Sequence, residues 1–303
     1  MCNTPETVPN PPYLIVKSIE LEKPQNGSDN FHPRVLPDDS PAGSSILRRS
    51  VVSTLAVIDR ELRKLRHDPV DLVTRAVQPA LWLLIFGQVF TRTHAIPTGN
   101  VSYIEFLAPG VLAQSVLFVA IFNDISVISE RDLGIVHKFL ASPAPRASLV
   151  LGKSLAGGIR ALIQAVVVTA LSAGIGVRLN FSPLHLLGVL SLVLLGATVF
   201  STFSLIIACL VKTRERFMGI GQILTMPLFF ASSAIYPVSM MPDWLRVVSR
   251  LNPLTYQVDG LRRLMLEGYQ GSLLPVVGDG ALLFGVLIVF VMICARLYPN
   301  LVR

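Results

Sequence analysis

Long runs of apolar residues follow one another between residues 72 and 294, separated by shorter polar stretches. A helix needs about 20 apolar residues to cross the hydrocarbon core of a bilayer, and most of the runs have about that length. The pattern predicts an all-α polytopic membrane protein with six transmembrane helices. The predicted spans are residues 72–91, 104–128, 155–177, 184–210, 217–236 and 273–294.

A different pattern precedes the first span. Between residues 46 and 68, apolar residues recur at helical spacing within an arc of roughly 80°, and basic residues occupy the other side. This pattern predicts an amphipathic helix on the cytoplasmic membrane surface, since no soluble domain follows against which it could pack. Residues 1–45 are rich in Pro, Asn, Ser and Asp, which is typical of a disordered tail. Residues 69–303 form the predicted transmembrane domain.

The charges fit the same interpretation. The 303 residues are 52% hydrophobic and only 15% charged, whereas soluble domains are about 25% charged. A net charge of +7 could suggest a nucleic-acid partner, but the Lys and Arg residues fall between the apolar runs, where they set orientation in the membrane. The connections at 129–153 and 211–216 are rich in basic residues and are expected in the cytoplasm. Both termini are then cytoplasmic.

The stretch from Met226 to Arg262 is too apolar for an ordinary loop and too often interrupted by proline for one spanning helix. Such a segment can dip back into the membrane where neighbouring helices cover its backbone. We therefore predict a re-entrant segment before the last span, with its outer part at about residues 237–270.

The connection after the second predicted span carries acidic and basic residues around a short apolar helix, predicted at about residues 130–143. Gly134 and Pro143 bound it, and Leu133 and Leu140 are among its apolar residues. A short amphipathic helix on the cytoplasmic face suits docking into a groove of a soluble partner. The alternative is a tight loop that lies on the lipid headgroups.

Ionisable residues within a span are costly and mark functional or structural pairs. Asp124 and Arg160 are predicted at similar depth near the cytoplasmic ends of their spans, so we expect a structural ion pair between them. The alternative is that each side chain extends to the nearby interface on its own. No metal-ligand cluster or hydrolytic constellation stands out in the sequence. Gly152-Lys153-Ser154 is not a nucleotide-binding loop, because Ala147 stands where that loop needs glycine. We therefore expect no catalytic site in this chain.

Two stretches together resemble the permeases of the ABC-2 transporter family, specifically the daunorubicin-resistance-like drug-export branch. The resemblance covers roughly residues 46–300. The residues that it assigns to ATPase coupling are Glu130, Arg131, Asp132, Gly134, His137, Lys138, Leu140, Pro143 and Arg146, followed by Gly152 and Lys153. The residues that it assigns to an outer gate are Pro227, Ser232, Ser233, Pro237, Pro242, Trp244, Asn252, Pro253 and Arg262. Ala234 stands where many members carry glycine.

The resemblance implies the permease subunit of an ATP-binding cassette exporter that moves an amphipathic drug or a lipid-like molecule. A separate ABC ATPase subunit would bind ATP and Mg, and this chain would hold no cofactor. The permease would work as a homodimer or heterodimer in the plasma membrane, the inner membrane of a bacterium. Export of a polysaccharide or lipid-linked saccharide is the alternative within transport, and a membrane-embedded enzyme or channel is the alternative from another class.

Overall fold

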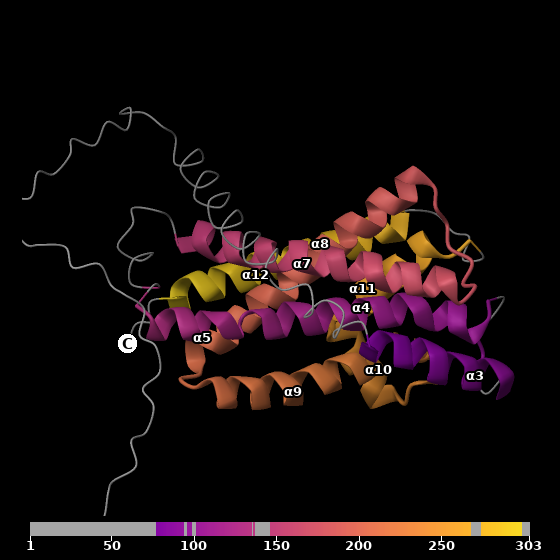
Figure 1. Cartoon of the computed structure of the whole chain (residues 1–303), viewed down its shortest axis with the longest axis horizontal. Coiled ribbons are helices and arrows are strands. Elements are labelled where there is room, and N and C mark those ends of the chain that lie inside the picture. Colours follow the sequence, from indigo (N-terminus) through magenta and orange to yellow (C-terminus); the bar gives the residue numbers. More distant parts are fainter. Residues whose placement is uncertain are drawn as a thin grey trace, which may run out of the picture. The chain divides into compact units, whose positions relative to one another are not determined.

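Long apolar helices make up much of the part of the chain that the structure describes. The computed structural model describes residues 77–93, 96–98, 101–134, 136, 146–267 and 274–298. In these ranges four helices are long and apolar enough to cross a membrane, and they run side by side in Figure 1. They are α4 (Tyr103–Asn123) continued by α5 (Ile125–Asp132), α7 (Arg146–Gly174), α8 (Pro183–Leu210) and α12 (Leu274–Leu297). This confirms an all-helical polytopic protein, without strands in the described part of the chain.

Shorter elements complete the fold. Before α4 come a π-helical turn, η1 (Trp82–Gly87), and α3 (Gln88–Thr93). After α8 come α9 (Arg214–Phe230), the 3-10 turn η2 (Val238–Met240), α10 (Asp243–Leu251) and α11 (Pro253–Met265). Helix α9 has 17 residues and ends at Phe230, six positions before the predicted end at residue 236. The predicted tail at 1–45 and the predicted amphipathic helix at 46–68 lie outside the described residues.

Local sequence explains where several helices begin. Ser102 and Glu105 form a capping box at the start of α4, in which the Glu105 carboxylate accepts from the Ser102 amide at 2.9 Å. Glu105 is therefore a capping residue at the end of a predicted span. Thr213 accepts from the amide of Arg216 and caps α9. Pro183 and Pro253 open α8 and α11, where the missing amide hydrogen costs nothing.

Helix α8 lies at the centre of the helical packing, in contact with α4, α7, α11 and α12. The apolar stretches of α4 and α8 are each 78% buried, whereas that of α12 is only 17% buried. Small residues permit the close contacts: a Cβ on Gly157 of α7 would lie 3.0 Å from the Ser201 hydroxyl of α8. The apolar stretch of α12 is therefore mostly exposed.

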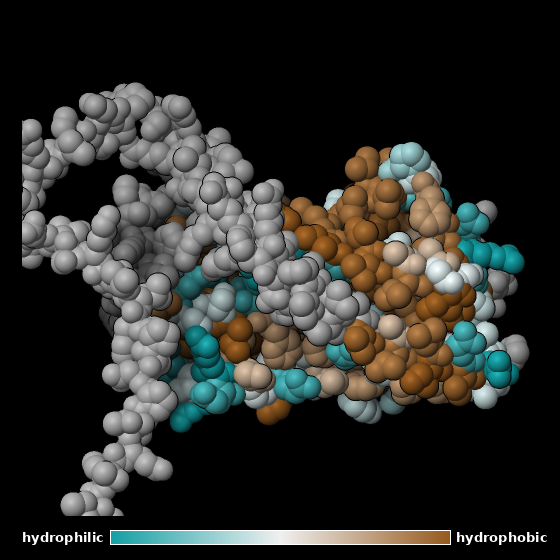
Figure 2. All heavy atoms as spheres, in the orientation of Figure 1, coloured by the Kyte–Doolittle hydropathy of each residue, from teal (hydrophilic) through white to brown (hydrophobic). Residues whose placement is uncertain are grey.

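The distribution of hydrophobic residues on the surface indicates which part of the molecule would contact lipid. Figure 2 shows hydrophobic residues over much of the visible face, while hydrophilic residues gather near α5 and the start of α9 and at the opposite edge beyond α3. We refer to these two ends as the Asp132 end and the Tyr103 end of the helices.

The turn after α9 packs against the side of α4 rather than beyond its end. The Tyr103 hydroxyl donates to the carbonyl of Ile235 at 3.2 Å. The Ala234 carbonyl oxygen lies so close to Gly110 that a Cβ there would be 2.3 Å away. Gly110 is seven residues into α4, or about 10 Å along the helix axis. Glycine at this position is therefore a packing requirement.

Replacing Gly110 by alanine is expected to destabilise the detergent-solubilised protein by about 1–3 kcal/mol, the usual cost of overpacking. The clash is with a backbone carbonyl, which cannot rotate away as a side chain would. The measurement is the midpoint of thermal denaturation. Gly285→Ala in α12 is the matched control, because its Cβ would meet nothing within 4 Å. Equal midpoints for the two variants would contradict this packing of the turn on α4.

Candidate functional site

The last four carbonyl groups of α9 have no partner within the helix, and each accepts a hydrogen bond from the segment that follows. We call residues 231–252 the helix break. Its donors are the Ala231 amide to Pro227 (2.8 Å), the Asn252 side-chain amide to Leu228 (2.6 Å), the Ser232 hydroxyl to Phe229 (2.7 Å) and the Tyr236 hydroxyl to Phe230 (2.5 Å). The end of the helix is thus satisfied by donors of the protein itself.

Asn252 joins the end of α9 to the start of α11. Its Nδ2 donates to the Leu228 carbonyl, and its Oδ1 accepts from the Leu254 amide at 3.0 Å, which caps α11. Pro253 follows at the first helical position. Both residues of the Asn-Pro pair, which the family resemblance assigned to the gate, therefore have a structural role.

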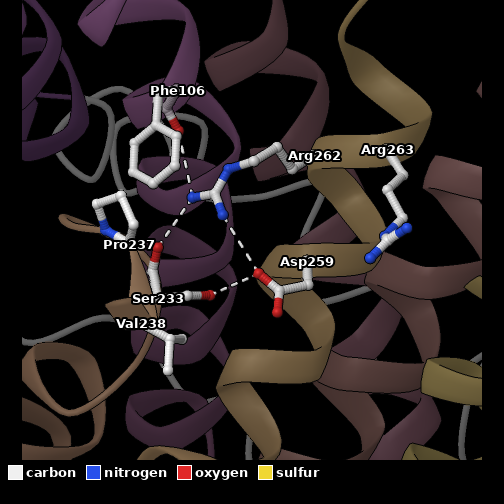
Figure 3. Close-up of a pocket in the computed structure, with 7 residues that line it drawn as sticks. All are labelled: Phe106, Ser233, Pro237, Val238, Asp259, Arg262 and Arg263. Atoms are coloured by element: carbon white, nitrogen blue, oxygen red, sulfur yellow. Dashed lines mark hydrogen bonds and ion pairs between the residues drawn. The ribbon is translucent and has the colours of Figure 1, made fainter. Parts of the chain in front are cut away.

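A buried arginine holds α11 to the helix break and to α4. Arg262 donates to the Asp259 carboxylate (3.2 Å) and to the carbonyls of Ser233 (2.9 Å) and Phe106 (3.4 Å), as Figure 3 shows. Its guanidinium carbon also lies 3.7 Å from the centre of the Phe106 ring. The Ser233 hydroxyl donates to the same carboxylate at 2.7 Å. We call these four residues the Arg262 cluster.

A cavity of about 200 Å³ lies beside the Arg262 cluster. It is lined by the four residues of the cluster together with Pro237, Val238 and Arg263. One part of the wall is therefore apolar and the other carries charges of both signs. The predicted gate residues Ser233, Pro237 and Arg262 all meet here, at the Tyr103 end of the helices.

Helix α10 places Trp244 away from this cavity. Trp244, Val247, Val248 and Leu251 are all exposed and recur at the spacing of one helix face. Pro242 precedes the helix, and Arg246 donates to the Met241 carbonyl at 3.1 Å, which ties the chain at its start. An exposed apolar stripe with Trp at one end is typical of a helix at a membrane interface.

At the opposite end, Glu130 of α5 and Lys153 of α7 form an ion pair at 2.6 Å, and each side chain is only 8% exposed. Glu130 was assigned to coupling and Lys153 to the motif that follows, but the sequence did not indicate that they meet. The pair fixes the last turn of α5 to the first turns of α7.

Arg131 fixes the same turn to a second neighbour. It donates to the carbonyls of Lys212 (2.5 Å) and Val211 (3.4 Å), in the connection between α8 and α9, and it pairs with Asp132 at 3.0 Å. Residues 130–132 therefore end α5 instead of beginning a new helix, and the chain turns at Leu133 and at Gly134, which has φ +70°. Only Gly tolerates that angle without strain.

The remaining predicted coupling residues divide into those that the structure describes and those that it does not. Arg146 is exposed at the start of α7. Leu133, an apolar residue of the predicted coupling helix, is 73% exposed at the Asp132 end. His137, Lys138, Leu140 and Pro143 lie outside the described residues, as does most of the predicted helix at 130–143.

Asp124 and Arg160 come to the same contact between α4, α7 and α8. Asp124 lies at the junction of α4 and α5 and accepts from the Ser201 hydroxyl at 2.8 Å. Arg160 donates to the side-chain oxygen of Asn123, the residue next to Asp124. The direct ion pair between Asp124 and Arg160 stays a prediction. Among the described residues, no three His, Cys, Asp or Glu side chains group as metal ligands.

The sequence matches the model of one protein family over residues 52–266, which is described as ABC-2 type transporter. The chain belongs to the ABC-2 type transporter family. Similar proteins include the ycf38 protein of Cyanophora paradoxa, 29% identical over 69% of this chain and 72% of its own length. The daunorubicin resistance ABC transporter permease protein DrrB1 of Streptomyces coeruleorubidus is 26% identical over 86% of this chain and 90% of its own. The inner membrane transport permease YadH of Escherichia coli K12 is 27% identical over 73% and 82%.

Sequence reasoning missed three contributors to the structure of this ABC-2 permease. Tyr236 and Asp259 lie within the stretch that identified the gate, but neither was assigned a role. Asn123 directly precedes Asp124, and only a view of the packed helices reveals it as an acceptor for Arg160. The sequence could have indicated the contact of Asp259 with Arg262, because the two residues are three positions apart and so lie on the same helix face.

Removal of one partner of the Glu130–Lys153 pair is expected to destabilise this ABC-2 permease by about 3–5 kcal/mol, because a charge is left buried without its counter-charge. Lys153→Gln tests this in a thermal or SDS unfolding titration. The reversed pair, Glu130→Lys with Lys153→Glu, should recover part of the loss. Asp243→Asn is the control, because it breaks an exposed pair with Arg246 and should leave the midpoint unchanged. A loss no larger than that of the control would contradict the pairing.

Asn252→Ala removes both the cap of α11 and the hydrogen bond to Leu228. The expected loss is about 2–4 kcal/mol, measured by the same unfolding titration. Asn252→Ser keeps a capping hydroxyl and should recover about 1 kcal/mol. Asn180→Ala is the control, since the Asn180 side chain accepts a single exposed bond from the Ser182 amide. An Asn252→Ala variant as stable as Asn180→Ala would argue against the double role.

Proposed function

We propose that this chain is the membrane-spanning permease subunit of an ATP-binding cassette exporter, driven by a separate ATPase subunit. The coupling assignment rests chiefly on the last turn of α5. Glu130 is paired with Lys153 of α7, and Arg131 binds the connection between α8 and α9. A force applied to this turn by a soluble partner would reach three other helices directly.

Exposed Leu133 beside this turn supplies a contact for such a partner. An apolar side chain that is 73% exposed next to anchored charges suits insertion into a groove of an ATPase. In this proposal the Asp132 end faces the cytoplasm, together with both chain termini. The partner would bind ATP and Mg, and the permease would pair with a second permease chain, identical or related, in the plasma membrane.

We further propose six spans and a re-entrant segment. The first span would comprise η1 and α3 with the residues before them, and α9 would be the fifth, since Trp82 packs edge-on against Phe229 at 5.6 Å. The close contact of Ala234 with Gly110 supports a segment that dips beside α4. The helix break and the Arg262 cluster would then form the outer gate, with Trp244 at the level of the headgroups.

An amphipathic drug or a lipid-like molecule is the cargo that we propose. The support is the similarity to DrrB1, whose name records daunorubicin resistance, and the apolar character of the helices.

The test is purification of the full chain from gently solubilised membranes. We expect a stoichiometric ABC ATPase to copurify and its ATP turnover to rise when an amphipathic cargo is added. Consistent absence of an ATPase from the complex would overturn the proposal.

Leu133→Ser should lower the ATPase affinity of the permease at least tenfold, as expected for an exposed apolar anchor at an interface, without a change in thermal stability. Leu184→Ser is the matched control: Leu184 is 66% exposed but lies at the start of α8, at the other end of the molecule. Retention of the ATPase by the Leu133 variant at wild-type affinity would contradict the docking assignment.

A further inference from the structure

Two adjacent arginines of α11 line the cavity at the Tyr103 end, and they are bound very differently. Arg262 is 2% exposed and donates to three acceptors. Arg263 lines the same cavity. None of the described residues forms a hydrogen bond or an ion pair with Arg263. Figure 3 shows its guanidinium separate from the bonded network of the Arg262 cluster.

An arginine in such a place is poised for an external acceptor. Its planar guanidinium presents five N–H donors that match a phosphate in a bidentate manner. Arg262 cannot take this role, because its hydrogen bonds hold α4, α11 and the helix break together. Within the cavity wall, Arg263 is therefore the cation available to a ligand.

Nearby carboxylates restrict the kind of anion that could bind. Asp259 lines the cavity, and only its Oδ1 is used by Ser233 and Arg262. Asp279 of α12 lies in electrostatic range of both Asp259 and Arg263, and its Oδ2 is buried without a hydrogen-bond partner among the described residues. A purely anionic ligand would be repelled by this pair, whereas a ligand that also carries an amine would be attracted.

We propose that the cavity binds a zwitterionic phosphate–amine headgroup, with the phosphate on Arg263 and the ammonium facing Asp259, in the electrostatic field of Asp279. Phe106, Pro237 and Val238 supply an apolar wall against which the glycerol and first acyl carbons of a phospholipid can lie. The inference rests on the proposed function only for placing this site in the outer leaflet. Binding requires neither an ATPase nor transport.

The test is binding of water-soluble, short-chain lipids to the purified full chain by calorimetry or native mass spectrometry. Dihexanoyl phosphatidylethanolamine should bind more tightly than dihexanoyl phosphatidylglycerol, and inorganic phosphate should bind more weakly than either. Arg263→Gln should weaken lipid binding by about tenfold or more, as the loss of a charged hydrogen-bond donor predicts. Arg263→Lys keeps the charge but loses the planar, bidentate guanidinium. Its lipid affinity should therefore lie between those of the wild type and Arg263→Gln.

Two further variants complete the test. Asp279→Asn should reduce the preference for ethanolamine over glycerol. Arg250→Gln is the control: this exposed arginine of α10 does not line the cavity, and the variant should bind as the wild type does.

Unchanged binding by Arg263→Gln, or phosphatidylglycerol binding at least as tightly as phosphatidylethanolamine, would overturn the proposal. If phosphate alone bound as tightly as the lipids, the site would be one for the free ion. No ATPase takes part in this binding test. A negative result therefore leaves the permease proposal unaffected, and the absence of a copurifying ATPase would leave the lipid-binding proposal unaffected.

Discussion

The last four carbonyl groups of a helix have no partner within the helix, and their acceptors must be satisfied by donors that lie beyond it. Helix α9 meets this constraint through Ala231, Ser232, Tyr236 and Asn252. The residue types at the donor positions of the segment that follows α9 are therefore constrained. A serine close to the helix end, a tyrosine that folds back, and an asparagine that reaches across from the start of α11 each supply a donor that an apolar residue could not.

The same constraint explains why a buried arginine is tolerated beside the break. Burial of a charge is costly unless its donors are paired, and Arg262 has a carboxylate, two carbonyls and an aromatic face. The two carbonyls belong to different elements, Phe106 on α4 and Ser233 in the helix break. Movement of α11 alone would break the bonds of Arg262 to both carbonyls and leave the guanidinium with the Asp259 carboxylate of α11 alone. The elements at this end are thus expected to move together.

The sequence was most informative where a pattern is local. The apolar run at 184–210 differs from α8 by one residue at its start, and the Asn-Pro and Ser-Pro pairs mark the starts of α11 and α8. Pairing across helices was less accessible. Depth along a span follows from counting residues, but the rotation and register of neighbouring helices depend on packing, which small residues such as Gly110 and Gly157 set. Glu130 and Lys153 were both recognised, and their contact was not. The position of Gly134 likewise marked a helix boundary without indicating that α5 ends there and that Leu133 is left exposed.

The two ends of the molecule are connected by one nearly continuous element. Helices α4 and α5 run together from Tyr103 to Asp132, from the Arg262 cluster at one end to the Glu130–Lys153 pair at the other. Their only break within that range is the turn at Asp124, which has φ −80° and ψ 0°. Ser201 of α8 binds Asp124 there, and Arg160 of α7 binds the neighbouring Asn123. A displacement of α5 can therefore reach the cluster at the far end of α4 only through a junction that α7 and α8 both hold. Because the last turn of α5 is itself bound to α7 and to the end of α8, rotation about Asp124 must carry these helices with it, and the polar residues at the junction keep the three in register.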